Sequence, residues 1–114
     1  MRFAVASKSG TEVDQHFGHA ERFLIFETGP EGSRLVEEVR VDKYCSFDPQ
    51  SPFRHRQFDA IADALRGCAA VVTAMIGQYP KEELKKSGIE AISATGTIEQ
   101  ALALAFERLD KSGR

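Results

Sequence analysis

The chain has 114 residues, the usual size of a single domain, and a formal net charge of −2, which leaves no broad basic field for nucleic acid. No apolar run approaches the roughly 20 residues that cross a membrane, and the apolar stretch at the N-terminus is too short for a signal peptide. Two cysteines, which we expect to be free thiols, favour a cytoplasmic protein. We therefore predict one domain over residues 1–110, a frayed tail at 111–114, and neither nucleic acid nor a membrane as partner.

The first part of the chain predicts three strands. Apolar residues alternate with small ones over 2–6, and a dense apolar run over 23–26 is typical of a buried strand. The letters TGPEGS that follow predict a hairpin turn, with a partner strand over 35–41. Glu37 interrupts the apolar face of that strand, which we therefore place at the edge of the sheet.

Helices and strands alternate in the rest of the chain, after an irregular stretch over 44–54. A first helix is predicted by the spacing of Phe58, Ile61, Ala62 and Leu65 and ends at Gly67, and a β-branched run over 69–74 predicts the next strand. A second helix has Pro80 in its first turn and closes at Gly88, and a strand over 89–94 follows it. A capping box of Thr97 and Gln100 begins the last helix, whose buried face holds Ile98, Ala101, Leu102, Ala105 and Leu109. The predicted order is βββαβαβα. Such alternation implies parallel strands with right-handed crossovers, so we expect an α/β fold with a five-stranded mixed sheet and helices on both faces.

The loop before the second strand holds the most unusual segment, in which His16 and His19 flank Phe17 and Gly18. Imidazole suits Zn, Cu, Fe and Ni, and a glycine lets the backbone take an unusual turn or approach a ligand closely. The two histidines are therefore candidate metal ligands. The alternative is that one of them caps a turn while the other is solvated.

The two cysteines stand in different contexts. Cys45 follows Lys43, a cation that favours the thiolate form that binds soft metals, so Cys45 is a further candidate ligand. The alternative is a small buried residue in a loop. Cys68 precedes the strand over 69–74 and is expected to pack in the core.

Two junctions between a strand and a helix are the last candidates. Gly77 follows the strand over 69–74, at the carboxyl end of a parallel strand, where open α/β sheets place ligands. The backbone N–H groups at the start of a helix also attract anions. The junction over 95–97 is similar, and an ordinary turn is the alternative at both places.

Signatures of common enzyme classes are absent from the sequence. It contains no phosphate-binding loop, no dinucleotide fingerprint after the first strand and no serine elbow. Cys45 with His16 or His19 makes a conceivable nucleophile pair, but none of them lies in a protease signature. Asp14 and Glu27 alone do not supply the clustered carboxylates of a two-metal nuclease. We predict that the protein is not an enzyme.

The segment from Val13 to Phe23 reads V-D-Q-H-F-G-H-A-E-R-F and resembles the signature of the dinitrogenase iron–molybdenum cofactor biosynthesis family, which includes NifX-like proteins and the C-terminal domain of the NifB type. The letters D-K-Y-C at 42–45, M-I-G at 75–77 and G-I at 88–89 follow in the expected order, so the resemblance covers nearly the whole chain. Two features depart from relatives. The three-cysteine motif of the radical enzymes is missing, and the stretch SFDPQSPFRHR lacks a further glycine and cysteine.

The resemblance implies a ribonuclease H-like fold without nuclease activity. It also implies a binding or carrier role, in which an iron–sulfur or iron–molybdenum cofactor precursor passes between cofactor-assembly proteins. His16 becomes the first candidate ligand, followed by His19 and Cys45. The remaining cofactor-binding candidates are Phe17, Gly18 and Gly77, with compensating charge from Arg22, Arg54 or Arg56.

Two or three ligands would leave coordination positions open for transfer, as a carrier requires. We expect a monomer or a weak homodimer, and no cluster after purification in air, because exposed clusters are oxidised easily. A shared site requires the His16 loop, the Cys45 loop and the Gly77 turn to meet at one end of the sheet. The alternatives are a regulatory or interaction module that lost the cluster, and a mononuclear Zn, Ni or Cu site at His16, His19 and Cys45.

Overall fold

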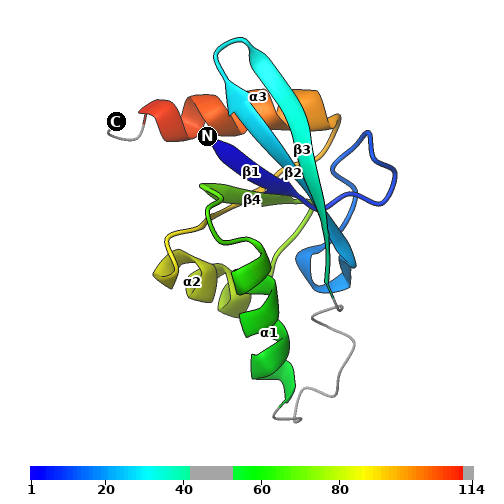
Figure 1. Cartoon of the computed structure of the whole chain (residues 1–114), viewed down its shortest axis with the longest axis vertical. Coiled ribbons are helices and arrows are strands. Elements are labelled where there is room, and N and C mark those ends of the chain that lie inside the picture. The colour runs from blue at the N-terminus through cyan, green and yellow to red at the C-terminus, as the bar shows by residue number, and fades with distance from the viewer. Residues whose placement is uncertain (42–52, 112–114) are drawn as a thin grey trace.

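The computed structural model describes residues 1–41 and 53–111 (Figure 1). Its elements are β1 (Arg2–Val5), a short 3-10 helix η1 (Phe17–His19), β2 (Arg22–Gly29), β3 (Gly32–Arg40), α1 (Phe53–Ala64), β4 (Ala70–Thr73), α2 (Gln78–Lys86), β5 (Glu90–Ser93) and α3 (Ile98–Lys111). Three strands come first, and helices and strands then alternate. The predicted α/β fold with a five-stranded mixed sheet is confirmed.

The sheet has the strand order β3-β2-β1-β4-β5. The strand β2 is antiparallel to both of its neighbours, whereas β1, β4 and β5 run parallel, so their carboxyl ends lie at the same edge of the sheet. β3 is an edge strand, as Glu37 predicted. Its pairing with β2 shifts where Ile25 faces Glu37 but Phe26 faces Leu35, which leaves Val36 as the extra residue of a β-bulge. A bulge of this kind makes an edge strand a poorer template for pairing with another chain.

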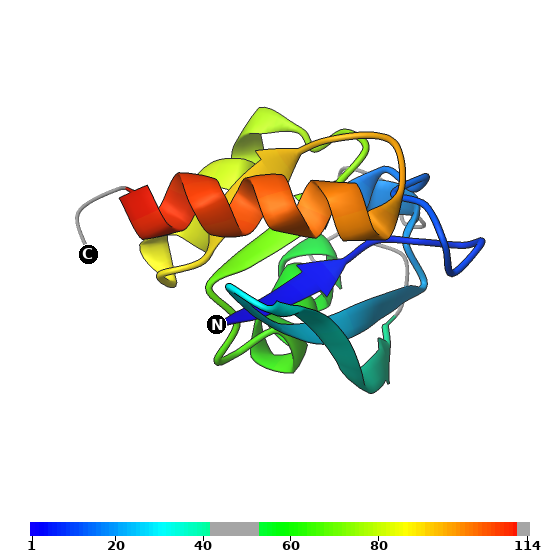
Figure 2. The same ribbon diagram turned by 90° about the horizontal axis from the view of Figure 1, so that it is seen from above.

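Helices cover both faces of the sheet. In Figure 1 the sheet lies between α3 above and the pair α1 and α2 below, and Figure 2 shows α3 lying across the sheet from the viewer's side. Two apolar clusters correspond to these faces. The cluster under α3 contains Phe3, Val5, Leu24, Val72, Ile92, Ile98, Ala101, Leu102 and Ala105, and the opposite cluster contains Ala4, Phe17, Phe23, Ile25, Ile61, Leu65, Cys68, Val71 and Leu84.

The ends of the helices agree with the sequence signals, with one difference. The Oγ1 atom of Thr97 accepts a hydrogen bond of 3.2 Å from the N–H of Gln100, the first half of the predicted capping box. Gly88 follows α2 with φ of 84°, a conformation that favours glycine. Arg54, which the sequence analysis put in an irregular stretch, lies in α1, because a proline directly before Phe53 favours a helix start there.

Two polar side chains, Cys68 and Thr73, are buried in the interior. Cys68 lies in the apolar cluster opposite α3, as predicted, and its burial raises the pKa of its thiol. The hydroxyl of Thr73, at the carboxyl end of β4, is buried and has no hydrogen-bond partner among the described residues. Among the described helices, none combines the length and apolar character that crossing a bilayer needs.

Candidate functional site

The segment between β1 and β2 crosses the carboxyl ends of the parallel strands. On the β5 side, Glu12 pairs with Thr97 in an isolated β-bridge, and the N–H of Val13 donates to the carbonyl of Gly96 at 2.9 Å. Gly96 has φ of 99°, in the region that favours glycine. We call the segment over 6–21 the histidine loop. The junction over 95–97, which the sequence left as either an ordinary turn or a ligand site, thus binds one side of this loop.

The other side of the loop is tied to the segment that follows β4. The N–H of Ala74 donates to the carbonyl of Gln15 at 2.9 Å, and the N–H of Phe17 donates to the carbonyl of Met75 at 2.8 Å. His16 and Met75 pair as an isolated parallel bridge. Gly77 lies two residues beyond Met75, so the structure brings the histidine loop and the Gly77 turn to one edge of the sheet. Figure 1 shows this loop, in blue, at the end of the sheet where β1 finishes.

A buried phenylalanine presents the two histidines on the surface. The ring of Phe17 is 1% exposed and contacts Phe23, with 6.0 Å between the ring centroids. His16 and His19 are both exposed, and their rings stack with centroids 5.6 Å apart and planes 13° from parallel. Residues three apart eclipse in a 3-10 helix, which accounts for the stacking of the residues that flank this turn. The result is a rigidly held pair of accessible imidazoles.

The Gly77 turn contributes backbone N–H donors, and its conformation does not require a glycine. Gly77 is the N-cap of α2 with φ of −72° and ψ of 163°, which any residue can adopt, and no side chain caps the helix start. A Cβ atom built there would lie 3.7 Å from the ring of Pro80, an ordinary contact. Gly77 therefore supplies no side-chain cap, and backbone N–H groups at the start of a helix attract anions.

Asp14 fixes the tip of the loop, a role that the sequence analysis did not assign. Its Oδ1 accepts a hydrogen bond of 2.7 Å from the N–H of Lys8, and its Oδ2 accepts one of 3.3 Å from Ser9. These N–H groups, Lys8 first, hold the pKa of the Asp14 carboxyl below its usual value. The available signal was an aspartate close to a run of Ser and Gly, because Asp side chains accept bonds from nearby backbone N–H groups in turns.

Arg22 joins the same loop to the sheet. Its Nε donates to the carbonyl of Ser7 at 3.1 Å, and its Nη2 donates to the carbonyl of Lys8 at 2.9 Å. Its Nη1 forms an ion pair of 3.4 Å with Glu38 on β3. The sequence analysis expected Arg22 to supply charge, and the structure adds a role in positioning the loop.

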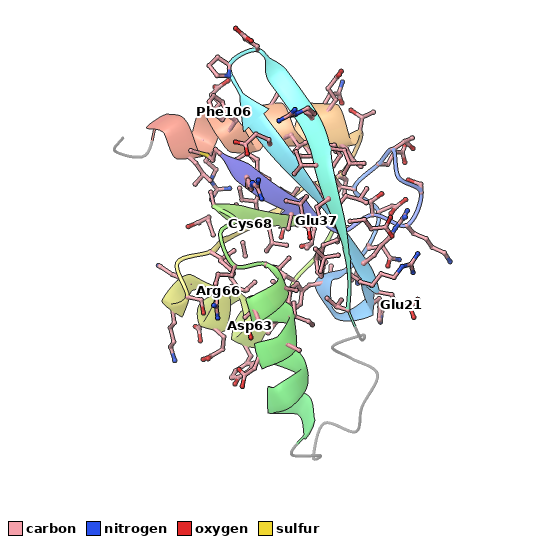
Figure 3. All side chains as sticks on the ribbon, in the orientation of Figure 1. Glu21, Glu37, Asp63, Arg66, Cys68 and Phe106 are labelled. Atoms are coloured by element: carbon pink, nitrogen blue, oxygen red, sulfur yellow. The ribbon has the colours of Figure 1, made fainter. Side chains whose placement is uncertain are left out.

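An open hollow of about 430 Å³ lies beside His19. It is lined by Ser7, Lys8, Gln15, His19, Glu21, Arg22 and Arg40. Figure 3 labels Glu21 at this end of the molecule. Three cationic side chains face one carboxylate here, although the chain as a whole has a net charge of −2. Lys8 and Arg40 were not identified from the sequence, because their proximity depends on the pairing of distant strands.

The predicted ligand Cys45 lies outside the described residues. Val41, the last described residue before it, donates its N–H to the carbonyl of Glu21 at 2.9 Å. Arg54 and Arg56 belong to α1, but their side chains are outside the described part. Within that part, no group of three or more His, Cys, Asp or Glu side chains is arranged to hold a metal ion. The assignment of His16, His19 and Cys45 as ligands stays a prediction.

Fold and site together define a small open-sheet α/β domain that carries its candidate ligand residues at the carboxyl ends of the parallel strands. The sequence profile described as dinitrogenase iron-molybdenum cofactor matches residues 1–108. The chain belongs to this family, which is related to the biosynthesis of the nitrogenase iron–molybdenum cofactor.

Relatives and a solved structure agree with this membership. The chain is 40% identical over 106 residues to the FeMo cofactor biosynthesis protein NifB of Frankia alni, covering 93% of this chain and 21% of that protein. It is 35% identical over 113 residues to NifB of Azotobacter vinelandii, covering 97% and 22%. The chain thus spans about one fifth of these relatives. In fold, it resembles the apo form of the orange protein from Desulfovibrio gigas, with a TM-score of 0.66, 20% identity, and coverage of 94% and 88%.

Proposed function

We propose that this domain binds an iron–sulfur or iron–molybdenum cofactor precursor and passes it between cofactor-assembly proteins. The observation that carries the proposal is the exposed, stacked pair of His16 and His19, held by buried Phe17 beside the Gly77 turn. Family membership supports involvement with such a cofactor. The NifB relatives are cofactor biosynthesis proteins, which supports the same class of cargo.

The proposed chemistry follows from the donors at this edge. Imidazole is a suitable ligand for an accessible iron of the cluster, with His16 as the first ligand and His19 as the second. Backbone N–H groups near Gly77, at the start of α2, would donate to sulfides of the cluster. Cys45 is proposed as a further, thiolate ligand. So few protein ligands leave positions through which a receiving protein can take the cargo.

We also propose that the domain is a cytoplasmic accessory without catalysis of its own. The strand order, with β2 antiparallel to the other described strands, supports a ribonuclease H-like fold. The strand β1, with the letters RFAV, contributes no carboxylate to a two-metal nuclease site. Membership of the dinitrogenase iron-molybdenum cofactor family supports an accessory role.

The test is anaerobic reconstitution with ferrous iron and sulfide, followed by gel filtration and analysis of iron and sulfide in the protein peak. We expect stoichiometric iron and sulfide with the wild-type chain, and loss of both in a His16→Ala, Cys45→Ala double variant. Equal retention by wild type and double variant would contradict the proposed ligands. No retention by wild type would contradict cluster binding itself.

An interaction module is the second candidate. The observation that favours it is the lack of a three-ligand group within residues 1–41 and 53–111. In that case the paired histidines would form part of a protein contact rather than a ligand set. Retention of zinc without sulfide, in the same reconstitution with zinc added, would instead support the mononuclear site.

A further inference from the structure

The hollow beside His19 contains a like-charge pair that the fold itself creates. Arg22 on β2 and Arg40 on β3 are directly opposite each other in the register of the hairpin. Like charges in opposite positions destabilise a sheet. Glu38 offsets part of this cost, because its Oε2 lies 3.4 Å from Arg22 and 3.3 Å from Arg40. Lys8 adds a third cation, so the lining holds three cations and one carboxylate, that of Glu21, while Asp14 accepts a bond from the N–H of Lys8 nearby.

The two arginine side chains differ in their exposure and in the hydrogen bonds that hold them. The Arg22 side chain is 28% exposed and is fixed by the carbonyls of Ser7 and Lys8. The bonds to Ser7, Lys8 and Glu38 do not exhaust the N–H donors of a guanidinium. The Arg40 side chain is 78% exposed and contacts Glu38 only through Nη2 within the described part. One guanidinium is therefore held at the wall of the hollow, and the other reaches into solvent at its rim.

The donors of the hollow favour oxygen anions. Guanidinium, ammonium, amide and hydroxyl groups line it, from Arg22, Arg40, Lys8, Gln15 and Ser7. Guanidinium groups match the geometry of carboxylate and phosphate oxygens through paired N–H donors. These cations would repel a free metal cation, whereas they would not repel an anionic cluster bound at His19.

We propose that this hollow is an oxyanion subsite that binds a carboxylate or a tetrahedral oxyanion next to His19. A ligand anion would neutralise the Arg22 and Arg40 pair that the sheet register forces together. A like-charge pair across two strands lowers stability, and proteins often keep such destabilising arrangements at binding sites. The inference goes beyond the proposed function, since the subsite needs no cluster and no metal.

The test uses metal-free, isotope-labelled full chain and two-dimensional ¹H–¹⁵N NMR. Citrate and inorganic phosphate are titrated separately, with sodium chloride at matched ionic strength as the baseline. We expect saturable shifts at the amides of Lys8, Gln15, His19 and Arg22 with at least one of the two anions. Stronger binding of citrate identifies a carboxylate site, and stronger binding of phosphate identifies a site for a tetrahedral oxyanion.

Charge-reversal variants separate this site from general attraction. Arg40→Glu and Lys8→Glu should each weaken binding by about tenfold, the loss of one charge-assisted contact. Arg66→Glu is the matched control, because its side chain is 81% exposed and follows α1, away from the hollow (Figure 3). Its affinity should stay within about twofold of wild type.

Two results would overturn the subsite. One is shifts that match those in sodium chloride, and the other is an equal loss of binding in Arg66→Glu. Arg22→Lys keeps the positive charge but removes the paired N–H donors of the guanidinium. It should therefore weaken anion binding even though Arg40 and Lys8 are unchanged. Failure of cluster reconstitution would leave these results untouched, because no iron is present in the titrations.

Discussion

The imidazole rings of His16 and His19 lie parallel on the surface, 5.6 Å apart, at the two ends of a single 3-10 turn. Both side chains are exposed, so the fold does not depend on them. We expect His16→Ala and His19→Ala each to change the free energy of unfolding by less than about 0.5 kcal/mol. Each should lower cluster affinity by at least about tenfold, as loss of a metal ligand does.

Urea denaturation and anaerobic cluster titration on the same samples check both parts of this prediction. A variant that unfolds easily would contradict the surface placement of the rings. Full cluster affinity in His16→Ala would instead remove this residue from the ligand set. His19→Ala provides the internal comparison, because it lies on the same turn.

Phe17 anchors the turn from below. Truncation to alanine would leave a cavity next to Phe23, and we expect a loss of about 3–5 kcal/mol in the free energy of unfolding. Leu104→Ala on α3 is the control, since that side chain is 67% exposed and should cost under about 0.5 kcal/mol. Chemical denaturation measures both. Equal stabilities would show that Phe17 is not part of the core.

Asp14 makes the stability of the loop depend on pH. The pKa of its carboxyl is lower in the folded chain than the ordinary value of 3.8. A carboxylate of this kind stabilises the fold above its unfolded pKa, and that contribution is lost as the pH falls through the folded pKa. Because the site is exposed, we expect Asp14→Asn to cost only about 1 kcal/mol at neutral pH.

The difference in unfolding free energy between wild type and Asp14→Asn should therefore be constant at neutral pH and shrink below pH 3.8. Urea denaturation of both chains across this range measures it. A difference that grows as the pH falls would have the wrong sign for a carboxylate with a lowered pKa.

Gly77→Ser tests the uncapped start of α2. A serine hydroxyl there can accept a bond from a backbone N–H of the first helical turn, although Pro80 supplies none, so stability should rise by at most about a few tenths of a kcal/mol. The same bond would occupy donors that we assign to the cargo, so cluster affinity should fall. Thermal denaturation and cluster titration give the two readings. Unchanged affinity in a stabilised variant would remove Gly77 from the proposed site.

Thr73 offers a prediction about stability alone. Its buried hydroxyl has no hydrogen-bond partner in the part of the chain that the structure describes, and an unsatisfied buried donor costs free energy. Thr73→Val keeps the branched shape and removes this group, so we expect an increase of about 1 kcal/mol in the free energy of unfolding. Chemical denaturation measures the change. A destabilised Thr73→Val would mean that the hydroxyl has a partner, such as an ordered water.

Local patterns predicted most of the architecture. The edge position of β3 followed from Glu37, and the buried face of α3 followed from the spacing of residues such as Ile98 and Leu102. Such signals are carried by side chains that are close in sequence, so a periodicity can reveal them. The bulge at Val36 carries no comparable signal, because it depends on how two strands pair.

The site was only partly predictable for the same reason. The motif around His16 and the turn at Gly77 belong to segments that the structure brings to one edge of the sheet. The bonds that join this loop to Met75 and Gly96 are between main-chain groups, which any residue can supply. The hollow depends on the register that places Arg22 opposite Arg40, and register is a property of the folded hairpin.

The main-chain bonds that join the histidine loop to the ends of β4 and β5 affect both the affinity and the rate of ligand binding. Its main-chain bonds form when the chain folds, so a guest meets groups that are already ordered and incurs little additional loss of conformational entropy. Association that needs no rearrangement is also faster than association that waits for one. Binding and release of a ligand can then both be fast, which suits the carrier role that we propose.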